Sequence, residues 1–172
     1  MSAQDYLDNL QETLSIMDDA LHWLERSYAK CQAIGIKEAY TEDEFDIFET
    51  LTSRFARASD ILIHKLFRSL DAVELETGGT MLDVVHRAEK RGLFESADDV
   101  RLIKDLRNQI VHEYVTKSLM EIFADTLTYT SNLLQIIQKT KAYCQQYLTG
   151  AFDTQAAQAE SNSTNPPGTV KK

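Results

Sequence analysis

The chain has 172 residues, a formal net charge of −9 and an apolar share of 43%. This length suits one domain, and the apolar share is enough for a core and too large for a disordered chain. The acidic balance argues against an extended nucleic-acid surface, because phosphate contacts need lysine and arginine, although a small basic cleft stays compatible with it. No membrane-length apolar run and no signal-peptide pattern occur, so we expect a soluble, cytoplasmic protein without membrane contact.

Turn-forming residues are scarce, with 6 glycines and 2 prolines. Such a composition predicts an all-α fold, here an up-and-down bundle of three long and two shorter helices. The first helix is predicted by apolar residues spaced by three and four, which keep one face apolar: Leu7, Leu10, Leu14, Met17, Leu21, Leu24, Tyr28 and Cys31. A capping box at residues 41–44 opens the second, whose inner face carries Phe45, Phe48, Leu51, Phe55, Ala58, Leu62 and Leu66.

The remaining elements are shorter or less regular. Residues 71–79 are expected to form a loop, Thr80 to cap a short third helix that stops at Gly92, and Ser96 to start a fourth. Ser118 with Glu121 has the form of a capping box that opens a fifth helix ending near residue 148. We therefore expect a folded domain over residues 1–149 and a disordered polar tail over residues 150–172.

Most residues that could carry chemistry are interpreted as structural. Cys31 and Cys144 lie on apolar stripes and are expected to be core thiols. His22, His64 and His86 have no convincing second ligand at helical spacing, so we expect neither a metal nor a cofactor. The basic stretch at residues 86–91 is either a solvated face or a surface that helps to hold RNA.

One polar run, Arg107-Asn-Gln-Ile-Val-His-Glu-Tyr114, differs from the rest of the chain. On a regular helix Asn108 and His112 share one line, whereas Arg107 and His112 point roughly 140° apart. A straight helix would not aim both at one substrate atom. Either the helix ends or distorts near His112, or two protomers meet and each supplies part of one site.

Histidine and arginine together suit RNA cleavage without a metal. A histidine can accept the proton of the 2′-hydroxyl that attacks the neighbouring phosphate. An arginine offers a permanent charge and a planar fork of donors to the phosphate as negative charge builds up in the transition state. Such a reaction would leave a 2′,3′-cyclic phosphate and would make DNA a poor substrate.

The spacing of Arg107, Asn108, His112 and Tyr114 resembles the R-x4-H-x-Y signature of HEPN domains, most of all HepT-type toxins of HEPN–MNT toxin–antitoxin modules. The resemblance covers roughly residues 4–148. It implies a two-fold homodimer whose motifs face each other across one cleft, and a metal-independent endoribonuclease. It also implies an MNT-family nucleotidyltransferase antitoxin that neutralises the toxin by binding or by transferring AMP. By position, Arg107 and His112 become the catalytic pair, Asn108 a supporting polar group and Tyr114 the AMP acceptor.

Plainer interpretations remain open. Arg107 could be a surface arginine, and His112 a helix-terminal histidine that satisfies carbonyl groups. Tyr114 could be an ordinary half-buried tyrosine. Some HEPN domains look like non-catalytic substrate-binding subunits of nucleotidyltransferases, and a dimeric scaffold is a third function.

Overall fold

The computed structural model describes residues 2–113 and 115–163, with the backbone alone for residues 116–117 and 151–163. Within this part of the chain every regular element is a helix, which confirms the predicted all-α class. The helices are α1 (Ala3–Ile34), α2 (Glu42–Asp60), the π-helix η1 (Ile61–Leu66), α3 (Phe67–Val73), α4 (Met81–Lys90), α5 (Ala97–His112) and α6 (Thr116–Ser163).

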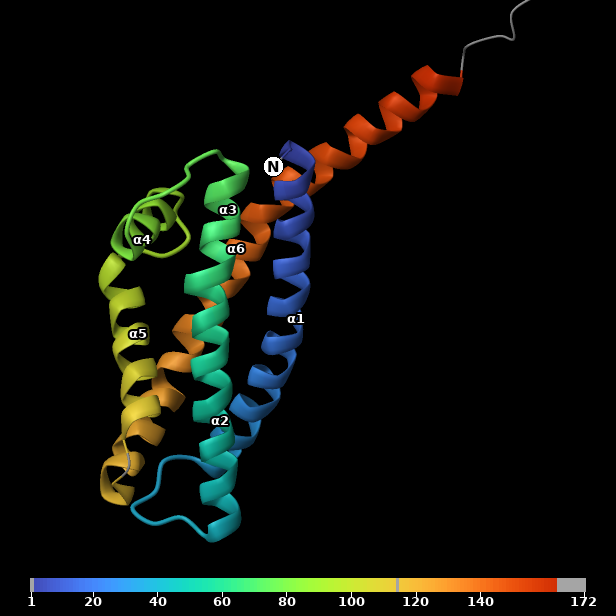
Figure 1. The fold of residues 1–172 in the computed structure, drawn as a ribbon. Helices are drawn as coiled ribbons and strands as arrows, with labels where there is room; N and C mark the ends of the chain where they lie inside the picture. The colour runs from blue at the N-terminus through green and yellow to red at the C-terminus, as the bar shows by residue number, and fades with distance from the viewer. Residues whose placement is uncertain (1, 114, 164–172) are drawn as a thin grey trace, which may run out of the picture.

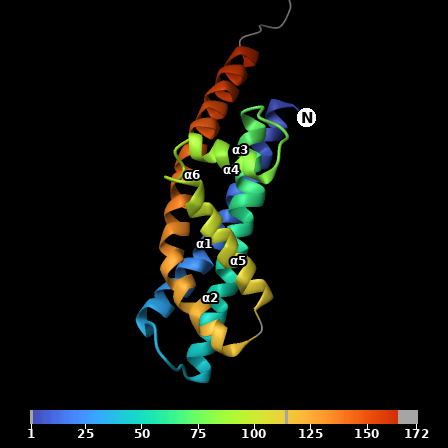
Figure 2. The ribbon, with the colours of Figure 1, turned by 90° about the vertical axis from the view of Figure 1, so that its left-hand side faces the viewer.

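The helices form three long rods and two shorter ones, as expected. The segments α2, η1 and α3 follow one another without a break, because the joining residues Asp60, Ile61, Leu66 and Phe67 all keep right-handed helical dihedrals. This rod lies between α1 and α5, with α6 behind it (Figure 1). The view turned by 90° shows α5 in front and α4 near the upper end (Figure 2).

The core forms where the apolar stripes of the three rods meet. Six residues of the predicted α1 stripe are buried: Leu10, Leu14, Met17, Leu21, Leu24 and Cys31. Between α2 and α6, Phe48 stacks on Phe123 with ring centroids 5.2 Å apart, and both rings are fully buried. Burial raises the pKa of the Cys31 thiol to about 11 and of the Cys144 thiol to about 12, so both are core thiols, as predicted.

Local sequence signals set several helix starts. The Thr41 hydroxyl accepts from the Glu44 N–H at 3.3 Å, and the Glu44 carboxylate accepts from the Thr41 N–H at 3.0 Å, which confirms the predicted capping box. Thr80 caps α4 in the same way. The predicted box at Ser118 is wrong, because α6 already begins at Thr116 and Ser118 lies inside its first turn.

The prediction that a loop begins at residue 71 is wrong, because the helix continues to Val73. Tertiary ion pairs explain the difference. Asp71, whose exposed fraction is 3%, accepts from Arg87 at 2.7 Å and pairs with Arg91 at 2.6 Å. The interpretation of the basic stretch at residues 86–91 as a solvated face is therefore wrong for these two arginines, which bind α4 and its C-cap to α3, whereas a role of the stretch in holding RNA stays a prediction.

Glu74 completes this polar network, which we expect to make folding sensitive to acid. Burial alone would raise the pKa of Glu74, but hydrogen bonds from Arg91, Tyr147 and Tyr143 outweigh it and lower the pKa below its ordinary 4.5. A carboxylate with a lowered pKa in the folded state stabilises the fold above its unfolded pKa and stops doing so as pH falls through the folded value.

Urea denaturation at pH 7 down to pH 3 should therefore show a free energy of unfolding that falls below about pH 4.5. Glu74→Gln should be less stable than the wild type at pH 7 and should lose less stability on acidification. Glu38→Gln removes the same charge from an exposed loop and serves as the control. Equal pH profiles for the two variants would contradict this role of Glu74.

The backbone of α6 is helical to Ser163, well beyond residue 149, where the sequence pattern places the end of the folded domain. Residues 164–172, the last part of the predicted disordered tail, lie outside the described residues. Among the described helices, none is both long and apolar enough to cross a membrane.

Candidate functional site

A cleft of about 560 Å³ opens where α5 passes the junction of α2 and η1. Its lining contains two residues of the predicted motif, Arg107 and Asn108, together with Lys104 from the preceding turn of α5. The facing rod supplies Arg57, Ser59, Asp60, Ile61, Ile63, His64 and Lys65. Basic side chains therefore outnumber the single carboxylate of Asp60, although the chain as a whole is acidic.

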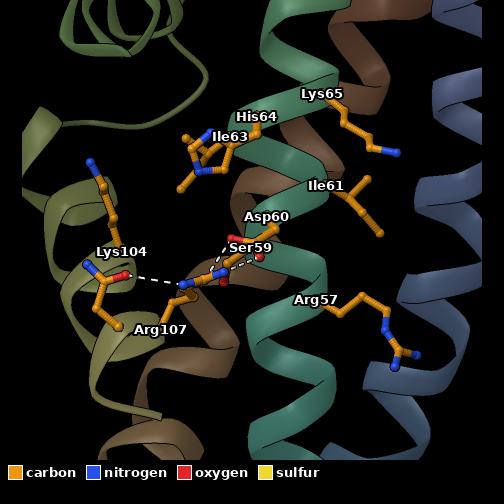
Figure 3. A pocket seen from close by; sticks show the side chains of 10 residues that line it. Arg57, Ser59, Asp60, Ile61, Ile63, His64, Lys65, Lys104 and Arg107 are labelled. Carbon is orange, nitrogen blue, oxygen red and sulfur yellow. Dashed lines mark hydrogen bonds and ion pairs between the residues drawn. The ribbon is translucent and has the colours of Figure 1, made fainter. Parts of the chain in front are cut away.

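Arg107 is held in place by Asp60. Its Nε donates to Asp60 Oδ1 at 2.8 Å and its Nη2 to Oδ2 at 2.7 Å, which is the paired geometry that fits a guanidinium to a carboxylate. These bonds raise the pKa of Arg107 above its ordinary value, so the side chain keeps its charge. Figure 3 shows Arg107 reaching from α5 to Asp60, with Lys104 and His64 above this pair.

The guanidinium keeps donor capacity for a ligand. Nη1 makes one long contact, 3.4 Å, with the Asn108 side-chain oxygen, and the Arg107 side chain is 30% exposed. A guanidinium has five N–H donors, and the bonds to Asp60 use only two of the three guanidinium nitrogens. Arg107 can therefore donate to an anion in the cleft without first leaving Asp60.

The C-terminal end of α5 places His112 on the surface. His112 is the last residue of the helix and is exposed, and Glu113 is extended, with φ −88° and ψ 129°. The prediction that the helix ends near His112 is confirmed. Yet His112 is not among the residues that line the cleft, so one chain alone does not bring its own Arg107 and His112 into this cavity.

Tyr114 lies outside the described residues, so its role as AMP acceptor stays a prediction. Two exposed valines, Val111 and Val115, lie on either side of it in the sequence, with exposed fractions of 44% and 60%. The end of α5 thus presents apolar and titratable groups together on the surface.

Of the ten residues that line the cleft, only Arg107 and Asn108 were predicted as site residues; Asp60, His64 and Lys104 are among the eight that were not. No pattern in the sequence predicted the π-helix. Its geometry is seen in the bond that the Phe67 N–H donates to the carbonyl oxygen of Leu62, five residues earlier. Single π turns inside α-helices are frequent at functional sites. The pairing of Asp60 with Arg107 joins residues far apart in the chain, which no local pattern indicates.

No family model, curated protein or solved structure matches this chain. The site is therefore interpreted from its own residues. Among the side chains that the structure describes, no group of three or more His, Cys, Asp or Glu residues is placed to hold a metal ion. The cleft is lined by four lysine and arginine side chains, a carboxylate that is paired with Arg107, an imidazole and an amide.

Proposed function

We propose that this protein is a metal-independent endoribonuclease, the toxin of a HEPN–MNT type toxin–antitoxin module. The observation that carries the proposal is the Arg107 guanidinium, oriented by Asp60 at the edge of a predominantly basic cleft in an otherwise acidic chain. Such a pre-oriented charge suits stabilisation of a phosphate that gains negative charge during reaction.

In the proposed reaction His112 accepts the proton of a ribose 2′-hydroxyl, and the resulting oxygen attacks the adjacent phosphorus. The bond from phosphorus to the 5′-oxygen breaks, and that oxygen takes a proton from water, whose hydroxide then recovers the proton that His112 accepted. The products are a 2′,3′-cyclic phosphate and a 5′-hydroxyl end. Arg107 donates to the non-bridging phosphate oxygens throughout, and Asn108 stands beside it as a further polar contact.

A second copy of the chain would complete the site. His112 ends α5 on the surface and does not line the cleft of its own chain, so we infer that the catalytic imidazole comes from the partner in a two-fold homodimer. In such an arrangement each copy supplies the same surface to the other, and two sites form at once. The exposed Val111 and Val115 would be covered by this contact.

The direct test incubates the purified chain with single-stranded RNA, with and without EDTA. Cleavage should proceed in EDTA, leave 2′,3′-cyclic phosphate ends and fail on DNA of the same sequence. Growth arrest on expression is expected as well. A purified dimer that leaves RNA intact would overturn the proposal.

Neutralisation is proposed to act through the motif tyrosine. Co-expression with an MNT-family nucleotidyltransferase should add mass in steps of one AMP, and Tyr114→Phe should abolish the gain. Added AMP brings negative charge and bulk that repel RNA phosphate. A gain in mass that survives Tyr114→Phe would exclude Tyr114 as the acceptor, whereas neutralisation without any gain would point to binding alone.

A non-catalytic subunit that presents substrate to a nucleotidyltransferase is the second candidate. The Arg107–Asp60 pair favours it, because a guanidinium bound at two points also serves as an interhelix contact. On this alternative, His112→Ala leaves function unchanged, whereas substitutions along the exposed face of α5 abolish partner binding.

A further inference from the structure

We propose that a basic stripe on the outer face of the α2–η1–α3 rod, formed by Arg57, His64, Lys65 and Arg68, binds the backbone of single-stranded RNA. The inference rests on the proposed nuclease function and names where the substrate runs beyond the cleft. All four side chains are exposed, and each lines at least one of the two grooves that flank the rod.

The stripe joins two grooves into one track. The cleft beside α5 lies on one side of the rod, and a second groove of about 470 Å³ lies on the other side, against α1. His64 and Lys65 line both of them. Figure 3 shows how this is possible, since His64 lies on the α5 side of the rod while Lys65 and Arg57 point towards α1.

The charge of this track opposes that of the whole chain. Its two grooves are lined by five lysine and arginine side chains, namely Arg57, Lys65, Arg68, Lys104 and Arg107, and by two carboxylates, Asp60 and Glu12. Asp60 is already paired with Arg107. This local excess of positive charge attracts a polyanion to this face of the protein. The rest of the chain, whose net charge is −9 overall, repels a polyanion.

The groove against α1 also offers contacts that suit nucleotides. Tyr6 supplies an aromatic face, and Asn9 an amide whose oxygen already accepts from Ser69 Oγ at 2.8 Å, which fixes its orientation. Stacking on aromatic rings and backbone contacts to a basic groove are the usual means of binding single strands. Each groove has the volume of a small-molecule pocket, which is enough for a nucleotide.

The test measures binding separately from cleavage. The probe is a fluorescent single-stranded RNA with 2′-O-methyl groups, which lacks the free hydroxyl needed for cleavage, and the readout is anisotropy. The double variant Lys65→Ala/Arg68→Ala should bind roughly tenfold more weakly, about threefold for each exposed charge lost. The slope of log K against log salt should become shallower by about 1.4, which corresponds to two phosphate contacts.

The matched control is Arg26→Ala/Lys30→Ala, which removes the same charge from exposed positions of α1 that line neither groove. It should bind within about twofold of the wild type. Thermal denaturation of both variants checks that each is folded. Equal weakening in the two variants, or wild-type binding by the stripe variant, would overturn the proposal.

Two further probes separate RNA from other anionic partners. The wild type and the stripe variant are also tested with phosphatidylserine vesicles and with polyglutamate. If the stripe variant loses binding to one of these but binds RNA as the wild type does, the stripe serves another partner and the proposal is overturned. If the wild type does not cleave RNA but binds the probe through the stripe, the nuclease fails and the stripe stands. If the wild type cleaves RNA but binds the probe independently of the stripe, the nuclease stands and the stripe fails.

Discussion

Replacing His112 with alanine is expected to lower the rate of RNA cleavage by roughly 10²–10⁴-fold, the usual contribution of a positioned general base. His112 is exposed at the end of α5, so its loss should leave the fold and its thermal midpoint unchanged. The measurement is the single-turnover rate on a labelled RNA with saturating enzyme, which separates chemistry from binding.

His86→Ala is the matched control, since His86 is an exposed histidine on α4 that contacts Glu89 at 3.3 Å and lies outside the cleft. It should cleave at the wild-type rate. A His112→Ala protein that cleaves as fast as this control would remove the imidazole from the mechanism and favour the non-catalytic subunit.

Mixing two inactive variants is expected to restore activity if the site is shared between copies. Arg107→Ala and His112→Ala each lack one member of the pair. In a mixed dimer, one of the two sites draws its arginine from the His112→Ala chain and its histidine from the Arg107→Ala chain. Random exchange should recover roughly a quarter of wild-type activity, because half of the dimers are mixed and each has one intact site.

The variants must be co-refolded or co-expressed so that their subunits exchange. Arg107→Ala leaves Asp60 without its partner, but the Asp60 side chain is 38% exposed and can be solvated, so the fold should persist. The Arg107→Ala variant, refolded alone in the same way, gives the background rate of RNA cleavage. No recovery from a demonstrably mixed dimer would mean that each chain uses its own Arg107 and His112, and the shared site would be wrong.

Local patterns predicted most of the bundle. The α1 stripe, the capping box at Thr41 and the helix cap at Thr80 depend on residues a few positions apart; six of the eight stripe residues are buried and both caps are present. The predicted helix boundary was wrong where a contact between residues far apart in the sequence overrides the local pattern. Asp71 stays helical because Arg87 and Arg91 pair with it from the next helix, although the glycines and polar residues that follow it suggest a loop.

The candidate site was only partly predictable for the same reason. Arg107 and Asn108 could be selected from one run of sequence, and both line the cleft. Asp60 lies on another helix, and its pairing with Arg107 depends on how α5 packs against α2. Arg57, Lys65 and Arg68 lie close together in the sequence, but their local excess of positive charge was not singled out because the chain as a whole is acidic.

The bond between Asp60 and Arg107 has a consequence for which anions could occupy a cleft of this kind. The Asp60 carboxylate lies 2.7 Å from the guanidinium, so its negative charge weakens the attraction that Arg107 exerts on an isolated phosphate or a free nucleotide. A strand that also reaches Lys104 and the lysine and arginine side chains of the neighbouring rod gains several attractions together, which offset this weakening. The abundant small phosphates of a cell would then be poor inhibitors, and occupancy would depend on polymer length.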